Sequence, residues 1–416
     1  GRVTQKKASA RTLLTYTYDL NGNQSSITDL TGKTTTYRYD AADRITEVAD
    51  NGTIRARYRY HADGTLRQLE VGETLRTEYG YDKDKNILSQ KTLLQPAEGR
   101  PVILTDNTYR YDGNANRIGK HTLSGETRYT YDCLNQVTKA ETPQGTEQYT
   151  YDRAGNRLTR STDSKKEEYR YDRTGKLITR TIIPHPEEPE SIYHYDYDKQ
   201  GNLLSDGENQ YTYDAMNRLT QVTTSDGKTQ INRYDGERLR YELEENGNVV
   251  EFLYNRDKVV VETTDNNTIR YIRGYELISS DSEKAKTYYH YVTDELGSIT
   301  HITDEDGEIL NRYEYDVYGN FTHKEETIEN RFGFTGEQYD PVTNLYYLRA
   351  RFYSPAIGRF IQEDTYYGDG LNLYTYCHNN PVTYVDPSGN VCDKKYQNYK
   401  QQGYSGVESG IKAKYD

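Results

Sequence analysis

Residues 149–160 read YTYDRAGNRLTR, and this stretch decides the fold. Its alternation of Tyr149 and Tyr151 has the period of two that is typical of a β-strand, with both rings on one face. The DRAGN segment that follows predicts a tight turn, because an Asp side chain accepts hydrogen bonds from the amides just ahead of it and Gly tolerates a positive φ. A second strand, RLTR, completes the stretch. It therefore predicts a β-hairpin.

The Tyr-Asp pair at the centre of this stretch recurs along the chain with a period of about 20 residues. A fixed period of this size indicates a repeat architecture, in which each hairpin must stack on its neighbours to bury its apolar face. We expect the repeated pairs to build a wall and to have no chemical role. They occur at Tyr18-Asp19, Tyr39-Asp40, Tyr81-Asp82, Tyr111-Asp112, Tyr131-Asp132, Tyr151-Asp152, Tyr171-Asp172, Tyr195-Asp196, Tyr213-Asp214 and Tyr234-Asp235.

The sequence predicts an all-β fold, in which the hairpins form a spiral ribbon and a partial hollow shell. An open sheet of hairpins would expose its edges, and the strong twist of antiparallel sheets favours coiling. We assign residues 1–248 to the repeats. Residues 249–330 keep the alternation with a looser period, so we interpret them as diverged repeats that lead into a cap.

Tyrosine explains how such a wall can be stable. It supplies 45 of the 416 residues, while Trp is absent and Phe occurs 6 times. A tyrosine buries a large ring while its hydroxyl still reaches water or a backbone partner. These residues therefore suit a thin wall that is wet on one side.

Charge and motif content narrow the possible functions. The 65 acidic residues exceed the 53 basic ones, which disfavours nucleic-acid binding by the array. The 8 histidines lack the spacing of metal ligands, and we predict no metal and no cofactor. No apolar run is long enough to span a membrane, and the N-terminus lacks the pattern of a signal peptide. Because the chain opens within repeat sequence, we expect residue 1 to be the edge of a fragment, with any export signal upstream of it.

The region after residue 330 carries a series of specific motifs. They are RFGFTGEQYD at 331–340, LYYLRARFY at 345–353, GRFI at 358–361, NLYTY at 372–376, NNP at 379–381 and DPSG at 386–389. This region resembles the Rhs-associated core domain. The Tyr-Asp array resembles the repeats of the same proteins, which include bacterial Rhs and WapA polymorphic toxins, the C component of Tc toxins, and teneurins. We therefore assign residues 331–390 to this core domain.

The resemblance implies a function for the shell. In this family the core domain plugs one end of the hollow shell, and a variable C-terminal toxin is held inside as cargo, with a cognate immunity protein as its further partner. Residues 391–416 would be the start of that variable region. They are too few to bury an enzyme core, so the toxin is truncated or lost in this chain.

The family's core domain is also a single-turnover aspartic autoprotease that cleaves after the motif DPxG, 18 residues, DPxGL. Here the second element is Asp386-Pro387-Ser388-Gly389, followed by Asn390 in place of Leu, and the first element keeps Asp364 but lacks its Pro and Gly. The resemblance implies that Asp364 and Asp386 are catalytic and that the Asn390-Val391 bond is cleaved.

The proposed chemistry requires the two carboxylates to meet. They would then share a proton, with one acting as base and the other as acid. Arg359, five residues before Asp364, is expected to orient one carboxylate with its bidentate fork. The competing interpretation is that the DPSG segment at 386–389 is only a type I turn.

Two other functions use the same wall. The chain would be a surface adhesin if its tyrosines bind a cell-surface glycan or receptor, or a degenerate shell if it carries no active cargo. Self-cleavage separates the toxin shell from both. A disulfide between Cys377 and Cys392 is also left open by the sequence.

Overall fold

The computed structural model describes residues 2–185, 188–368 and 370–392, and it confirms the all-β prediction. The helical segments in these ranges are two single 3₁₀ turns, η1 (Phe334–Gly336) and η2 (Cys377–Asn379). All other regular elements there are strands. They form two long antiparallel sheets and one short sheet.

The first sheet holds 18 strands, each paired antiparallel with the next along the chain. They are β1 (Gln5–Ala8), β2 (Arg11–Tyr18), β3 (Gln24–Asp29), β4 (Thr34–Tyr39), β5 (Ile45–Asp50), β6 (Thr53–Tyr60), β7 (Leu66–Val71), β8 (Leu75–Tyr81), β9 (Ile87–Leu94), β10 (Val102–Tyr111), β11 (Arg117–Thr122), β12 (Gly125–Tyr131), β13 (Val137–Thr142), β14 (Gly145–Tyr151), β15 (Arg157–Ser161), β16 (Lys165–Tyr171), β17 (Leu177–Pro184) and β18 (Ser191–His194).

The second sheet continues the pattern with 14 strands, and the third has four. The second comprises β19 (Asp196–Tyr197), β20 (Leu203–Ser205), β21 (Gln210–Tyr213), β22 (Leu219–Thr223), β23 (Thr229–Tyr234), β24 (Arg240–Glu245), β25 (Asn248–Asn255), β26 (Lys258–Thr264), β27 (Asn267–Arg273), β28 (Leu277–Ser282), β29 (Thr287–Thr293), β30 (Ile299–Thr303), β31 (Ile309–Tyr315) and β32 (Phe321–Glu326). The third comprises β33 (Gln338–Asp340), β34 (Leu345–Tyr347), β35 (Phe352–Ser354) and β36 (Arg359–Phe360).

The hairpin turn has the structure that the sequence predicts. Asp152 Oδ1 accepts hydrogen bonds from the amides of Ala154 (2.8 Å) and Asn156 (2.9 Å), and Oδ2 accepts from the Asn156 side chain (2.9 Å). Gly155 adopts a φ of +77°, which an L side chain rarely does. The Tyr151 hydroxyl donates to the carbonyl oxygen of Val137, at 2.7 Å. The second tyrosine of this repeat therefore fastens it to the preceding one.

One repeat places its turn two residues later than the pair that we counted. Asp196 of the pair Tyr195-Asp196 lies in β19, and the turn begins at Asp198. Asp198 Oδ1 accepts from the Asn202 amide at 2.8 Å. Two Tyr-Asp pairs are adjacent here, at 195–196 and 197–198. The turn forms at the second pair, because only Asp198 is followed by a Gly three residues later and an Asn four residues later.

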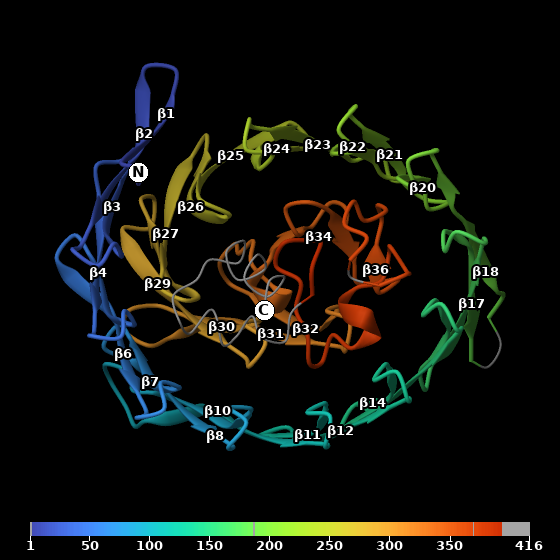
Figure 1. Ribbon diagram of the computed structural model, residues 1–416, viewed down its shortest axis with the longest axis horizontal. Coiled ribbons are helices and arrows are strands. Elements are labelled where there is room, and N and C mark those ends of the chain that lie inside the picture. Colours follow the sequence, from blue (N-terminus) through green and yellow to red (C-terminus); the bar gives the residue numbers. More distant parts are fainter. Residues whose placement is uncertain (1, 186–187, 369, 393–416) are drawn as a thin grey trace.

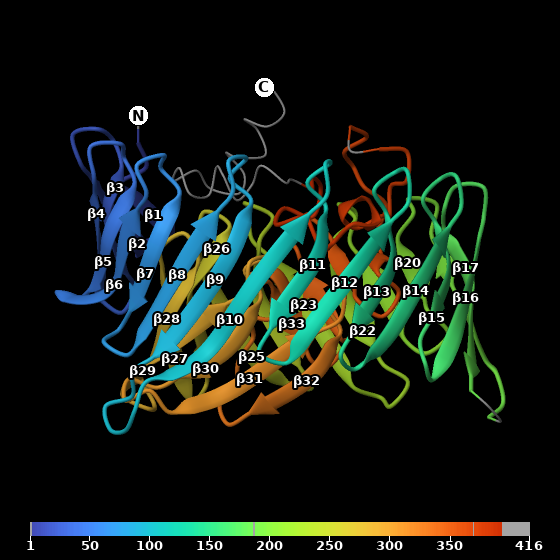
Figure 2. The ribbon, with the colours of Figure 1, turned by 90° about the horizontal axis from the view of Figure 1, so that it is seen from below.

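The hairpins form an open spiral (Figure 1). The strands of the outer wall lie side by side with a common tilt (Figure 2). The wall runs from β2 through β18 to β24, and the chain then turns inward so that β26–β30 lie inside β3–β10 (Figure 1). Arg270 on β27 pairs with Asp50 on β5 through two hydrogen bonds of 2.7 and 2.8 Å. Ile272 and Ile278 pack with Val48 of the outer wall. The diverged repeats are thus a second layer.

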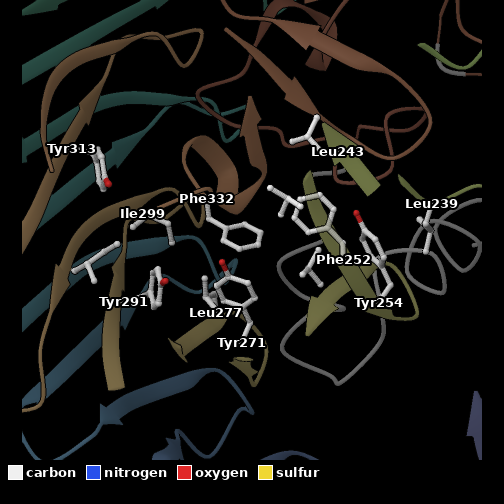
Figure 3. Packing of buried hydrophobic residues seen from close by; sticks show 13 residues of the cluster. Leu239, Leu243, Phe252, Tyr254, Tyr271, Leu277, Tyr291, Ile299, Tyr313 and Phe332 are labelled. Carbon is white, nitrogen blue, oxygen red and sulfur yellow. The ribbon is translucent and has the colours of Figure 1, made fainter. Parts of the chain in front are cut away.

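The core region occupies the centre of the spiral (Figure 1). Its sheet β33–β36 packs against the wall through an apolar cluster that includes Leu345, Phe352 and Leu219. Figure 3 shows where the core region begins: the ring of Phe332 packs edge-on against Tyr271 of β27, with ring centroids 4.9 Å apart. The second layer and the core region thus both lie inside the outer wall (Figure 1).

Candidate active site

Arg351 brings together the two aspartates that the sequence singled out. Its Nη2 lies 2.6 Å from Asp364 Oδ2 and 3.9 Å from Asp386 Oδ2. The three side chains are between 3% and 6% exposed. Two carboxylates, 22 residues apart in sequence, therefore share one buried guanidinium group.

The short sheet sets the position of Arg351 and Asp364. Arg351 immediately precedes β35, and its guanidinium stacks on the ring of Phe360 in β36, 3.6 Å from the centroid. Its Nη1 donates to the carbonyl oxygen of Leu373 (2.8 Å), which also accepts the amide of Asp364 (3.0 Å). The Tyr366 amide donates to Asp364 Oδ1 at 2.7 Å. Asp364 is thus fixed by backbone contacts on both sides.

Asp386 organises the segment that follows it. Its Oδ1 accepts hydrogen bonds from the amides of Gly389 (2.8 Å), Asn390 (3.2 Å) and Val391 (3.3 Å). The DPSG segment is therefore a turn capped by its own aspartate, as the competing interpretation requires. The turn and a catalytic role are compatible, because Asp386 Oδ2 faces Arg351.

Gly389 lets this turn approach the core sheet closely. A Cβ at this position would lie 2.4 Å from the carbonyl oxygen of Leu348, and the residue has a φ of +73°. The Gly389 carbonyl oxygen accepts a hydrogen bond from Arg351 Nε. The same arginine thus holds both aspartates and the peptide next to the expected cleavage bond.

Both residues of the expected scissile bond contact a carboxylate. The Val391 nitrogen lies 3.3 Å from Asp386 Oδ1. The Asn390 carboxamide is assigned the orientation that satisfies its hydrogen bonding. In this orientation its Nδ2 lies 3.2 Å from Asp364 Oδ1 and 3.1 Å from the Gly389 carbonyl oxygen.

Arg359 lies elsewhere, and the contact that we expected from it is made by Arg351. The Arg359 Nη2 donates to the carbonyl oxygen of Gly175 at 2.6 Å, and the guanidinium lies over the rings of Tyr171 and Tyr374. Neighbouring residues of a strand point to opposite faces, so Phe360 faces Arg351 while Arg359 faces the wall. Distance in sequence from Asp364 was a poor guide, because β35 brings Arg351 back beside it.

The core region contacts the wall at one hairpin turn after another. Side chains of the core region donate hydrogen bonds to the turns that end the Tyr-Asp strands. The pairs are Asn380 to Asn116 (3.1 Å), Asn379 to Gly155 (2.7 Å), Asn372 to Asn156 (2.8 Å), Arg359 to Gly175 (2.6 Å), Tyr374 to Gly201 (2.9 Å) and Gln362 to Asn217 (2.8 Å). The wall therefore holds the elements that carry the carboxylates.

Other candidate features are limited. The described ranges contain no group of three or more His, Cys, Asp or Glu side chains placed to bind a metal ion. None of the helical segments in those ranges is long and apolar enough to cross a membrane. Cys377 and Cys392, whose pairing the sequence left open, pack in one apolar cluster without a disulfide between them. Most of the expected variable region, from residue 393 on, lies outside the described residues.

Known toxins share stretches of this sequence. The chain is 39% identical over 209 residues to the tRNA3(Ser)-specific nuclease WapA of Bacillus spizizenii, covering 46% of this chain and 9% of that protein. It is 28% identical over 239 residues to the double-stranded DNA deaminase toxin A of Burkholderia cenocepacia, covering 47% of this chain and 17% of the toxin. The chain thus spans less than a fifth of either relative's length.

Solved structures share the fold. The crystal structure of TcdB2-TccC3-TEV matches 90% of this chain and 21% of its own, with a TM-score of 0.70 and 21% identity. A Tc holotoxin pore of Photorhabdus luminescens matches 90% of this chain and 21% of its own, with a TM-score of 0.68 and 20% identity.

Family models cover most of the array. The RHS repeat matches residues 18–55, and the teneurin YD-shell matches residues 114–382, which is more than half of the chain. The protein is thus a β-hairpin shell related to toxins, and it belongs to the teneurin YD-shell family.

Proposed function

We propose that this chain is the shell portion of a secreted bacterial toxin, which encloses a C-terminal toxin domain and releases it by one self-cleavage at the Asn390-Val391 bond. The observation that carries the proposal is the pair Asp364 and Asp386 on Arg351, with the Val391 nitrogen 3.3 Å from Asp386. The shell relationship supports the enclosure, because relatives of this fold are toxins.

The residues are suited to general acid–base cleavage. Asp386 Oδ1 accepts the N–H of the leaving nitrogen, so a proton carried by this carboxyl group would be within reach of that nitrogen, while Asp364 can take a proton from the attacking group. Arg351 compensates the negative charge of the pair and holds the Gly389 carbonyl in place. The bond between the Asn390 carbonyl carbon and the Val391 nitrogen breaks once, so the reaction is a single turnover.

The departures from the family motif leave this arrangement intact. Tyr367 stands where the first motif element has Gly, and it is 74% exposed, so its ring does not crowd the carboxylates. Thr365 replaces a Pro, and the backbone still places Asp364 beside Arg351. The third departure, Asn390, adds a polar group that reaches Asp364.

The cargo and its partners are inferred from the relatives. Those proteins include a tRNA nuclease and a DNA deaminase, which shows that shells of this kind occur in toxins of different chemistry. We infer that the toxin of this protein follows residue 390, that a cognate immunity protein protects the producing cell, and that an export signal precedes residue 1.

The adhesin alternative has less support. A sugar-binding wall needs exposed aromatic faces, but the first tyrosines of the central repeats are buried. Tyr109 is 3% exposed, Tyr149 2% and Tyr169 3%. These rings pack inward, toward the second layer and the core region.

The test is the intact mass of the purified chain. Wild type is expected to lose residues 391–416, while Asp364→Asn and Asp386→Asn stay at full length. Asp152→Asn is the matched control, because Asn is also accepted in a turn and this aspartate belongs to the wall, so the control should be cleaved. A full-length mass for wild type after purification and prolonged incubation would overturn the proposal.

A further inference from the structure

The side chain of Asn390 supplies a nucleophile inside the candidate site. Its Nδ2 points at Asp364 Oδ1, 3.2 Å away, and the Asn390 carbonyl is the one whose bond to Val391 is expected to break. An asparagine Nδ2 that attacks its own main-chain carbonyl carbon closes a five-membered ring. Because the nucleophile and the carbonyl belong to one residue, the attack is intramolecular and needs no second molecule to be positioned.

Such a ring closure requires a base and an acid, and the two aspartates stand at the right atoms. Asp364 accepts the hydrogen bond of the attacking Nδ2, so it is placed to remove its proton. Asp386 lies 3.3 Å from the nitrogen that must leave. Arg351 is closer to Asp364 than to Asp386, 2.6 against 3.9 Å, so this cation holds Asp386 less tightly than Asp364.

Limited solvent access also favours an internal nucleophile. Asp364 is 6% exposed and Asp386 is 3% exposed, and Arg351 and the turn at 386–389 pack over them. Hydrolysis needs a water molecule held between the carboxylates and the carbonyl carbon. Cyclisation needs no such water, because its nucleophile is the side-chain amide of the residue whose carbonyl is attacked.

We propose that this chain cleaves itself by cyclisation of Asn390 in place of direct hydrolysis. A bond forms between Nδ2 and the carbonyl carbon of Asn390, and the bond from that carbon to the Val391 nitrogen breaks. The Nδ2 proton passes to Asp364, and the proton of Asp386 passes to the Val391 nitrogen. No water is consumed, and the products are a shell that ends in a succinimide and a released segment with a free amine at Val391.

This inference rests on the proposed cleavage at the same bond, and the mass of the shell fragment separates the two. At early times the wild-type fragment should be lighter by one water molecule than the fragment produced by hydrolysis. In water enriched in oxygen-18, that early fragment should carry no label. Hydroxylamine should convert the succinimide to a hydroxamate, a change that needs no variant and therefore does not depend on mutant folding.

Substitution gives a second readout. Asn390→Leu removes the nucleophile and should abolish cleavage, whereas Asn114→Leu, an exposed turn residue of the wall, should cleave as wild type does. Thermal unfolding of both variants would show whether Asn390→Leu remains folded. A labelled fragment of hydrolysis mass at the earliest time, or cleavage of Asn390→Leu, would overturn cyclisation while leaving aspartyl hydrolysis intact. An uncleaved wild type would overturn both proposals.

Discussion

Two of the buried arginines that meet carboxylates, Arg240 and Arg351, do so in different ways. Arg240 of the wall binds Asp340 of the core region through two hydrogen bonds, of 2.5 and 2.9 Å, with both side chains 0% exposed. Gln230 donates a further bond to Asp340 at 2.8 Å. Arg351 instead contacts Asp364 closely, at 2.6 Å, and Asp386 from a greater distance, at 3.9 Å.

The difference indicates which site is structural. At Asp340 the carboxylate is paired through both of its oxygens with the fork of one arginine. At the Arg351 site the two carboxylates are held unequally, and one of them also contacts the peptide expected to break. Complete pairing is typical of an anchor between wall and core, whereas unequal sharing is what the proposed acid–base cleavage requires.

The largest effect should come from breaking the anchor. Arg240→Leu places at this position the type of residue that other repeats carry, but it leaves Asp340 buried without its cation, so the free energy of unfolding should fall by about 3–5 kcal/mol. Chemical denaturation measures the loss. Arg38→Leu, whose side chain is 78% exposed, is the control and should change stability by less than ~1 kcal/mol. Equal losses in the two variants would refute the assignment of an anchor.

The next effect concerns the unequal site. Arg351→Lys keeps the charge but loses the planar fork, and cleavage should slow by about 10²–10³-fold, as when one stabilising donor is removed from an active site. Arg359→Lys should leave the cleavage rate near that of wild type, because its group contacts the wall. The rates follow from gel analysis of freshly refolded protein. A slower reaction in Arg359→Lys alone would restore the role that the sequence suggested.

A third test uses a buried group that has no carboxylate bound to it. His290 donates to or accepts from Ser279 Oγ at 2.8 Å, and burial, aided by Arg55, lowers its pKa from 6.5 to about 4. The unfolded chain takes up this proton near pH 6.5 and the folded chain only near pH 4, so stability falls as the pH falls through this window, by up to ~3 kcal/mol.

The measurement is the melting temperature between pH 7 and pH 4.5. His290→Asn retains a polar group near Ser279 and cannot take up the proton, so its melting temperature should fall less steeply than that of wild type. His121→Gln, on the exposed side of the wall, is the control. If His290→Asn and wild type show parallel curves, burial of this histidine is not the source of acid sensitivity.

The smallest effect tests a neutral hydrogen bond within the wall. Tyr151→Phe removes the hydroxyl that binds the Val137 carbonyl oxygen and Tyr318, and it should cost ~1 kcal/mol. Tyr18→Phe, near the exposed outer edge, should cost less. Thermal unfolding of both variants gives the comparison. A loss as large as that of Arg240→Leu would show that repeat-to-repeat bonds matter as much as the anchors.

The sequence was sufficient for the wall because its signals are local. The Tyr-Asp alternation and the Asp-to-Asn turn act within a few residues, as in 149–160, and each hairpin pairs with the next. The identity of the arginine between the two candidate aspartates depends instead on how β35 folds back, which no local pattern shows. The layering of β26–β30 on the outer wall depends on contacts such as Arg270 with Asp50, more than 200 residues apart.

One signal in the sequence could have located the anchors. The position five residues after each turn aspartate is aliphatic in most repeats, as in Ile45, Leu177 and Leu219. It is Arg at 117, 157 and 240, and each of these side chains is buried against a later part of the chain. A charge at an otherwise apolar repeat position therefore marks where the wall is joined to something else.

The series of contacts between the core region and the hairpin turns has a consequence for timing. Each hairpin closes a short loop, whereas the bond from Asn380 to Asn116 joins residues 264 apart. Short loops close in microseconds or less. Long-range pairing comes later, because its entropic cost is offset only by contacts with a wall that has already formed. Asp364 and Asp386 come together on segments of the core region that are held by contacts with those turns. Self-cleavage would thus act as a checkpoint, cutting the chain only after synthesis and coiling of the wall are complete.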